Sequence, residues 1–339
     1  ILLGDKDDKK NKQTVFVPYY SCGLKTQRDS WCYNSSLDSL NFNMEQATAF
    51  YNKQRELLTL GKIQDVIYDS TRISWTTNVL NAAKKNEIIP LDKIGENSNC
   101  LYRPYFKQYG CYSRFWNERV YQLPKLFPTS KYKNLVICVS GVGVTKDFSC
   151  IITDMLPDLE LIGKSQCFPL YWYEENKNKQ QTLSLFDTES SDDYIRRDGI
   201  TDWILKEVRT RFGNARKITK ETIFYYVYGL LHSPKYREAF AADLKKSLPR
   251  IPIVEDIDAF LDFSYAGKQL ANLHLNYEEI PAYEGVTVIG DRQKEEAPDG
   301  RMIAGTTDLY AVKVDYKYYE VEKMRFPKKG QKDTIIYNL

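Results

Sequence analysis

The sequence predicts an α+β protein in which a β-rich part, residues 21–175, precedes a helical part with terminal β strands, residues 200–339. Three observations support this prediction. Short apolar runs typical of buried strands lie between residues 134 and 154, capped amphipathic segments follow residue 200, and a polar linker, residues 176–199, separates the two parts. A chain of 339 residues is long enough to bury a large core.

The N-terminal segment ILLGDKDDKKNK differs in composition from the rest of the chain. It has neither an initiating methionine nor a signal-peptide pattern, which indicates a cut inside a longer polypeptide. Its lysines and aspartates predict the frayed end of a preceding domain. We therefore interpret residues 1–20 as a tail or linker.

Two helices are predicted before the strands begin. The first runs from Asn43, which is suited to an N-cap, to Gly61, which is suited to end a helix. Its apolar face consists of Ala47, Phe50, Tyr51, Leu57 and Leu58. The second covers residues 74–86.

The β-rich pattern begins at Cys100. The segment LYRPYFKQYGCYSRFW is typical of a hairpin that turns near Gly110, and NLVICVSG and FSCIITD are typical of buried strands. The segment SQCFPLYWYEE predicts one short edge strand, because Pro169 has no N–H to donate to a central ladder.

Cap residues locate the helices of the C-terminal part. Thr201–Asp202, Thr219 and Ser233 each precede an apolar segment of helical period, and Pro234 occupies the favoured first helical position after Ser233. The prolines of LPRIP end the third of these helices. EDIDAFLDFSYAGKQLANLHLNYE predicts a further helix, and LYAVKVDYKYYEVEKMRF alternates in places like a terminal strand.

Composition excludes several classes of protein. The net charge of +3, from 48 basic and 45 acidic residues, is too small for a polycation, so affinity for nucleic acid must come from a local patch. The 26 tyrosines indicate a contact surface. Seven cysteines, an odd number, disfavour a disulfide framework and indicate a cytoplasmic protein, and no apolar run is long enough for a membrane span.

Motifs for metal binding or nucleotide binding are weak. Closely spaced Cys or Cys/His pairs that would predict zinc do not occur, and His232 and His274 lie in apolar helical segments where a structural role is expected. SGVGVTK and GLKT lack the glycine spacing of nucleotide loops. GLKT can nevertheless present backbone N–H groups and Lys25 to a phosphate.

Basic residues among aromatic or proline neighbours are the feature that recurs. Examples are Lys25 and Arg28 near Trp31, Arg103 between Tyr102 and Pro104, Arg114 beside Phe115 and Trp116, and Arg250 in LPRIP. Guanidinium groups on fixed backbones suit phosphate anchoring and bidentate base contacts. The alternative is that these arginines stack on aromatic rings and tie the fold together.

Several longer segments point to one family: GLKTQRDSWCYN, YRPYFKQYGCY, KNLVICVSGVG, FSCIITDMLPDLE, KSQCFPLYWYEE, YYVYGLLHSPKYREAFAADLKKSLPRIP and GKQLANLHLNYE. Together they resemble the C-terminal specificity region of Type ISP restriction-modification enzymes, from about Val15 to the end of the chain. In this bacterial family a nuclease, a helicase-like ATPase, a coupling region and an N6-adenine methyltransferase precede a target-recognition domain.

The resemblance implies sequence-specific binding of duplex DNA on behalf of that upstream methyltransferase and helicase-nuclease. It implies no catalytic residue, metal site or cofactor in this chain, because S-adenosylmethionine, ATP and Mg would serve the upstream domains. The chain is expected to stop before the family's usual C-terminal segment, which would leave the terminal strands incomplete.

The resemblance also implies a site. In the family a GxKTxRD motif directly follows the methyltransferase, so GLKTQRD is expected near the junction of methyltransferase, DNA and recognition domain. Asp29 is expected to orient Arg28 through a charge-assisted hydrogen bond. The expected DNA-binding residues are Lys25, Thr26, Arg28, Arg103, Arg114, Lys164 and Arg250.

Two alternatives to DNA recognition stay open. The chain can act as a structural brace that docks on the methyltransferase through its aromatic residues. A metal-dependent nuclease is a distant third, since Asp308, Asp315 and Lys317 have loosely suitable spacing but a solvated strand face explains them better.

Overall fold

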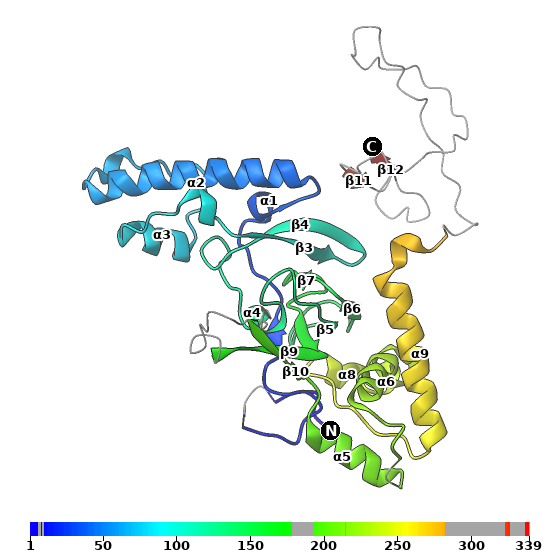
Figure 1. Cartoon of the computed structure of the whole chain (residues 1–339). Helices are drawn as coiled ribbons and strands as arrows, with labels where there is room; N and C mark the ends of the chain where they lie inside the picture. The colour runs from blue at the N-terminus through cyan, green and yellow to red at the C-terminus, as the bar shows by residue number, and fades with distance from the viewer. Residues whose placement is uncertain are drawn as a thin grey trace, which may run out of the picture. The chain divides into compact units, whose positions relative to one another are not determined.

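The structure is a computed structural model that describes residues 1–5, 8, 10–177, 193–213 and 215–281, and the backbone of 323–325 and 336–338. The chain forms two compact units, Ile1–Glu278 and Glu279–Leu339 (Figure 1). In the second unit the described strands β11 (Lys323–Arg325) and β12 (Ile336–Asn338) pair antiparallel. All other elements described below belong to the first unit.

Two four-stranded sheets form the centre of the first unit. The first sheet contains, in spatial order, β1 (Ser21–Cys22), β8 (Gln166–Pro169), β5 (Val136–Val139) and β6 (Cys150–Thr153), all antiparallel. The second contains β2 (Tyr33–Asn34), β4 (Phe106–Tyr112), β3 (Glu96–Arg103) and β7 (Leu156–Pro157), with only β3 and β7 parallel. A separate two-stranded ribbon pairs β9 (Tyr171–Glu175) with β10 (Tyr194–Asp198).

Strand β5 divides the hydrophobic interior because successive side chains of a strand point to opposite faces. Ile137 and Val139 join a core with the C-terminal helices, whereas Val136 and Cys138 join a core with the second sheet. All four residues of β5 are buried. A continuous apolar run is what a strand covered on both faces requires.

The C-terminal helices cover one face of the first sheet. They are α5 (Asp202–Arg211), α6 (Lys220–His232), α7 (Pro234–Ala239), α8 (Ala241–Leu244) and α9 (Ile257–Leu275). Helices α6 and α9 approach closely at two glycines: a Cβ at Gly267 would lie 2.0 Å from the Tyr225 carbonyl oxygen, and one at Gly229 would lie 2.3 Å from that of Phe263. Only a residue without a side chain permits this approach.

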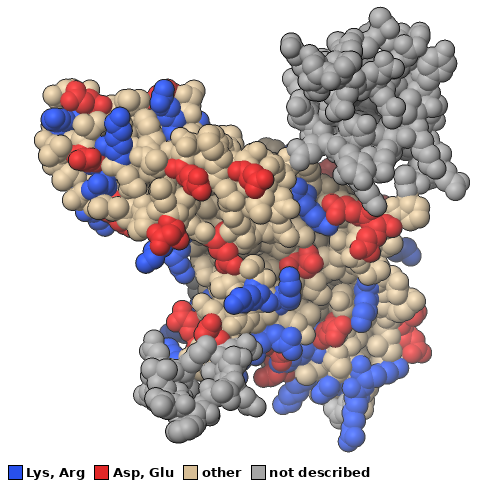
Figure 2. Space-filling view, turned by 45° about the horizontal axis from the view of Figure 1, so that its top comes forward, with Lys and Arg blue, Asp and Glu red and all other residues tan. Residues whose placement is uncertain are grey.

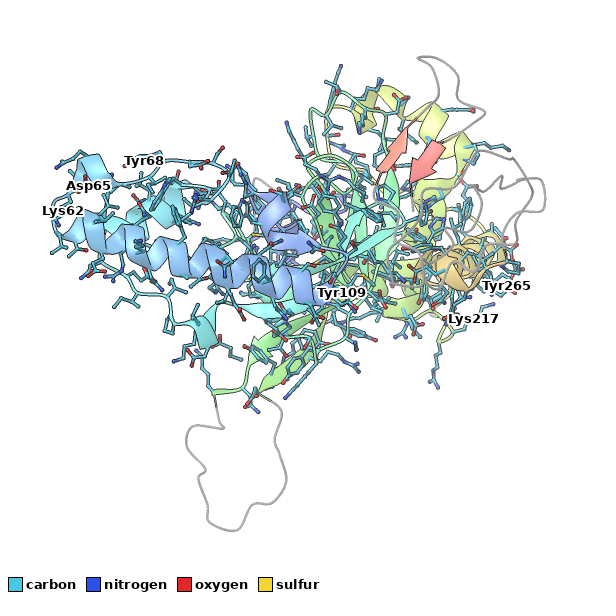
Figure 3. The ribbon with its side chains drawn as sticks, turned by 90° about the horizontal axis from the view of Figure 1, so that it is seen from above. Lys62, Asp65, Tyr68, Tyr109, Lys217 and Tyr265 are labelled. Atoms are coloured by element: carbon cyan, nitrogen blue, oxygen red, sulfur yellow. The ribbon has the colours of Figure 1, made fainter. Side chains whose placement is uncertain are left out.

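A helical arm, formed by α2 (Leu37–Thr59) and α3 (Thr77–Lys84), extends from the second sheet and has its own hydrophobic core. Tyr51 is at the centre of that core and donates its hydroxyl to the Glu87 carbonyl at 2.8 Å. Figure 3 shows Lys62, Asp65 and Tyr68 at the far end of this arm. The short elements are α1 (Asp29–Cys32), α4 (Leu123–Leu126) and the 3-10 turns Ile63–Asp65, Leu91–Lys93 and Tyr277–Glu279.

The structure corrects two predictions in the N-terminal half. Helix α2 begins after Ser36, whose hydroxyl accepts from the Ser39 N–H at 3.3 Å, and not at Asn43. The β3–β4 hairpin turns at Pro104–Tyr105 and not at Gly110. Gly110 instead lies within β4, where a Cβ would be 2.5 Å from the Cys100 sulfur. A glycine is needed at this position for close packing and not for a turn.

The prediction of one edge strand over SQCFPLYWYEE is also wrong. The segment forms two strands, and β8 lies between β1 and β5. Pro169 is tolerated because it is the last residue of β8. The polar linker predicted at 176–199 ends in strand β10, while residues 178–192 lie outside the described residues.

The predicted helix starts in the C-terminal part are confirmed at Thr201, Thr219 and Ser233, which all cap helices through their hydroxyls. The third predicted helix is interrupted at Phe240, so it forms α7 and α8. The prediction of a frayed N-terminus is wrong for the first residues, because Leu3 is fully buried and Leu2 pairs with Thr14 and Arg250.

Candidate nucleic-acid interface

The loop Gly23–Asp29 is held on both sides by backbone pairing. Leu24 donates to Pro157 and accepts from Leu159, each at 2.8 Å, and Lys25 exchanges two hydrogen bonds of 3.0 Å with Arg119. A Cβ at Gly23 would lie 2.3 Å from the Asp158 carbonyl oxygen, so this position requires glycine. The loop is therefore fixed by the sheet and presents its side chains from a defined backbone.

Thr26 organises the interior of this loop. Its side chain is almost fully buried, its hydroxyl donates to the Asp29 carboxylate, and it accepts from the Arg28 N–H at 3.2 Å. Tyr102 donates to the other carboxylate oxygen of Asp29 at 2.9 Å. Thr26 thus has internal hydrogen-bond partners and orders the loop from its buried side.

Arg103 links this loop to the second sheet. Its Nη1 donates to Asp158 Oδ1 at 2.7 Å, its Nη2 lies 3.5 Å from Asp29 Oδ2, and its guanidinium carbon lies 3.8 Å from the Tyr102 ring centre. The expectation that Asp29 pairs with Arg28 is wrong within the described part of the chain, since the carboxylate contacts Arg103 instead. Arg103 has the contacts expected of an arginine that ties the fold together.

Asp158 is the buried anchor of this network. Its carboxylate also accepts from the Tyr33 hydroxyl at 3.1 Å and from the Glu160 N–H at 2.8 Å. Burial raises the pKa of Asp158 to about 6, although these hydrogen bonds and Arg103 act in the opposite direction. Burial likewise raises the pKa of Tyr33.

An open depression of about 510 Å³ lies beside the loop. It is lined by Lys25, Thr26, Arg28, Asp29, Asp158 and Glu160, with Leu24, Gln27, Ser30 and Leu159. The Arg28 guanidinium lies 5.9 Å from the Trp31 ring centre, and its Nε is buried without a hydrogen-bond partner in the described residues. Because Asp29 and Asp158 are engaged by Arg103, the cations Lys25 and Arg28 remain available to an anionic ligand such as a phosphate.

The remaining predicted site residues are exposed, and only one of them lies beside the loop. Lys164 precedes Ser165, whose carbonyl accepts from the Gly23 N–H at 3.1 Å. Arg114 follows β4 and makes no ion pair with the described residues. Arg250 pairs with Leu2 in an isolated β-bridge. Figure 1 shows the N-terminus well separated from α1, which begins at the end of the loop.

A family model for the Type ISP C-terminal specificity domain matches residues 15–339. The chain belongs to this family. Solved structures of Type ISP enzymes agree with the assignment. The ATP-dependent Type ISP restriction-modification enzyme LlaBIII bound to DNA is 33% identical, with a TM-score of 0.74 over 100% of this chain.

Two further structures are similar to this Type ISP specificity domain. A nuclease-deletion mutant of the Type ISP enzyme LlaGI with a DNA substrate mimic is 29% identical, with a TM-score of 0.70 over 99% of this chain. A cryo-EM structure of a DrdV–DNA complex is 27% identical, with a TM-score of 0.70 over 88%. The present chain covers 19%, 22% and 28% of the LlaBIII, LlaGI and DrdV chains, respectively. A search of curated proteins finds no match.

Two observations concern chemistry other than binding in the described part of the specificity domain. His232 contacts the carbonyl oxygens of Tyr228 and Cys150 at 2.9 and 3.1 Å, and burial lowers its pKa to about 4, in line with the expected structural role. No cluster of three metal-ligating side chains occurs among the described residues. Asp308, Asp315 and Lys317 lie outside them.

The same described residues contain no helix that is both long and apolar enough to cross a membrane. All seven cysteines are free thiols.

Two features of the site were missed in the sequence analysis of this specificity domain. No local signal identifies Asp158 as the partner of Arg103, because the two are 55 positions apart. Arg119, which pairs with Lys25, has Tyr121 close by, so the pattern of basic residues among aromatic ones could have identified it.

Proposed function

We propose that this specificity domain binds duplex DNA and selects a short target site for the remainder of a Type ISP restriction-modification enzyme. The observation that carries the proposal is the similarity over the whole chain to LlaBIII, whose structure contains DNA, at 33% identity. The partner within the same polypeptide would be an upstream N6-adenine methyltransferase. Seven free thiols are compatible with a bacterial cytoplasm, where such an enzyme would act.

The loop Gly23–Asp29 supports a role in anchoring DNA. Lys25 and Arg28 border an open depression, and their backbone is fixed by pairing to Arg119 and by the buried Thr26 hydroxyl. Contacts from rigid elements to phosphates set the register of a protein on the duplex, and side chains at base edges then supply the sequence preference. We assign Lys25 and Arg28 to the first of these tasks.

The charge distribution supports a localised and not a general affinity. On the face that Figure 2 shows, Lys and Arg side chains are interspersed with Asp and Glu. A net charge of +3 adds little long-range attraction. Binding would therefore depend on a few phosphate contacts and weaken as salt rises. The domain itself would need no cofactor, since S-adenosylmethionine, ATP and Mg would be used upstream.

The proposal is tested by selecting the 339-residue chain against a randomised duplex library at low and near-physiological salt, followed by sequencing of the bound pool. One enriched asymmetric motif that persists at the higher salt is expected. Binding that enriches no sequence and disappears with salt would contradict target recognition by this chain. A role as a brace on the methyltransferase would then be favoured.

A further inference from the structure

The ribbon β9–β10 carries a second set of aromatic and basic side chains. Trp172 pairs with Arg197 and Tyr173 with Arg196 across the two strands. The guanidinium carbon of Arg196 lies 4.4 Å from the ring centre of Tyr171. Both arginines are exposed, and the two strands form a sheet of their own.

A stack of three side chains connects this ribbon to the N-terminal segment. The rings of Tyr19 and Trp172 lie 4.2 Å apart, and Lys125 Nζ lies 4.2 Å from the centre of the Tyr19 ring. Lys125 is exposed and belongs to α4. A cation over an aromatic ring keeps its outer side open to a further anion, because the ring carries no full charge.

Two chain segments run side by side from this stack to the loop described above. Lys25 pairs with Arg119, the Ser21 hydroxyl accepts from the Gln122 N–H at 3.0 Å, and Lys125 contacts Tyr19. The exposed cations Arg119 and Lys125 therefore lie between the loop and the ribbon. Six positions of chain separate Arg119 from Lys125, and six residues span at most about 20 Å.

The carboxylates near these cations are largely engaged elsewhere. Glu174 forms a 3.2 Å ion pair with Arg197, and Asp198 pairs with Lys220 at 2.9 Å. Glu118 is buried and lies 3.8 Å from Arg119. Within the described residues, Lys125 and Arg196 contact aromatic rings and no carboxylate. Lys125 thus has no carboxylate partner among the described residues, and Arg119 has only the 3.8 Å contact with Glu118, so this pair of exposed cations fits a polyanion better than it fits an ordinary protein surface.

We propose that Arg119 and Lys125 form a track for the DNA sugar–phosphate backbone that extends from the Lys25–Arg28 loop to the Tyr19–Trp172 stack on the β9–β10 ribbon. This inference rests on the proposed function and adds a surface to it. The track contacts phosphates, so it strengthens binding to every duplex equally and does not choose the sequence. The aromatic stack Tyr19–Trp172 holds Lys125 and the ribbon in place.

The test compares the intact chain with Arg119→Gln, Lys125→Gln and the double variant. Dissociation constants are measured by fluorescence anisotropy over a series of salt concentrations, on the selected duplex and on a scrambled duplex. Each lost phosphate contact should reduce the slope of log K against log salt by about 0.9, which weakens binding about eight-fold at about 0.1 M salt. The effect should be the same on both duplexes.

Arg216→Gln and Lys217→Gln are the matched controls, because they remove exposed charges before α6 and Figure 3 shows Lys217 near Tyr265, away from the ribbon. Both controls should leave the salt slope unchanged. Thermal unfolding of every variant verifies that the exposed substitutions do not alter folding.

Each other outcome is distinguishable. Wild-type binding with unchanged slopes in the Arg119 and Lys125 variants would overturn the track while the proposed function stands. Loss on the selected duplex alone would overturn it in favour of base recognition by the ribbon. Unchanged DNA binding with lost association to the methyltransferase would identify a protein interface. If the wild-type chain binds neither duplex, the proposed function itself fails.

Discussion

The Arg103 guanidinium donates to the buried Asp158 carboxylate at 2.7 Å and joins two segments 55 positions apart. Arg103 is about one-third exposed, whereas the Asp158 side chain is 4% exposed. Arg103 also contacts Asp29, so the pair attaches the loop that carries Lys25 and Arg28 to the second sheet. Two arginines that look alike in the sequence thus have different surroundings: Arg103 is engaged by carboxylates, and Arg28 is not.

This difference predicts distinct effects of two alanine substitutions. Arg28→Ala should weaken binding of the selected duplex and of a scrambled duplex alike and reduce the salt slope by about 1, because a phosphate contact is lost, with the melting temperature unchanged. Arg103→Ala should lower the free energy of unfolding by about 1.5 to 3 kcal/mol, because a hydrogen bond to a buried charged group is lost. Calorimetry and DNA titration of both variants check the prediction. Unchanged DNA affinity in both variants would remove these arginines from the interface.

The raised pKa of the Asp158 carboxyl predicts that the stability of the protein depends on pH. The pKa of this carboxyl is about 6 in the folded protein against an ordinary value of 3.8, so the folded state holds the proton more tightly than the unfolded state. The contribution of this carboxyl to the free energy of unfolding is fully present below its pKa in the unfolded chain. It is lost as the pH rises through about 6. The loss is on the order of 3 kcal/mol.

The measurement is the melting temperature from acidic to neutral pH for the wild type and Asp158→Asn. The asparagine variant lacks the titrating group, so the wild type should lose stability relative to it as pH rises from about 4 to about 6. A constant difference between the two proteins over this range would contradict the raised pKa.

Thr26 provides a test of whether the neighbouring residues Lys25 and Thr26 both act directly on DNA. Its hydroxyl is buried and bonds Asp29 and the Arg28 N–H, so Thr26→Ser should retain affinity. Thr26→Val should cost about 1 kcal/mol of stability through the lost hydrogen bonds, and should weaken DNA binding only through the loosened loop. Loss of affinity in the valine variant with stability fully retained would instead argue for a direct contact of the hydroxyl.

Gly23 predicts a steric limit at the same site. In Gly23→Ala the new methyl group would lie 2.3 Å from the Asp158 carbonyl oxygen, so the loop must shift. We expect a loss of about 1 to 3 kcal/mol in unfolding free energy together with weaker DNA binding. Gly61→Ala is the comparison, because its surroundings are open and only its positive φ is unfavourable. An equal effect of both substitutions would show that space at Gly23 is not limiting.

The elements that were predicted correctly depend on local chemistry. Thr201 and Thr219 cap helices because a hydroxyl accepts from a backbone N–H three positions on, and such a signal lies within one turn. The apolar runs at β5 and β6 predict buried strands for a comparable reason. The α+β class and the family resemblance, which depend on such segments in order, are both confirmed.

Features that depend on contacts between distant segments could not be predicted from local chemistry. Gly110 has the appearance of a turn residue, yet it lies in a strand because Cys100 and Tyr33 fill the adjacent space. Asn43 has the appearance of an N-cap, yet the helix begins earlier, after Ser36. In both cases the local preference is weak, so the burial of neighbouring side chains decides the outcome.

The sequence by itself thus determined the class, the helix caps, the buried strands, the family and the loop that carries Lys25 and Arg28. Only the tertiary structure assigned Arg103 to Asp158 and brought Tyr19 and Lys125 to Trp172 on the ribbon. The physical reason is the separation along the chain over which each kind of interaction acts. Capping and periodicity act within a few residues, whereas ion pairs and ring stacks form between groups that only the folded chain brings within a few ångströms of each other.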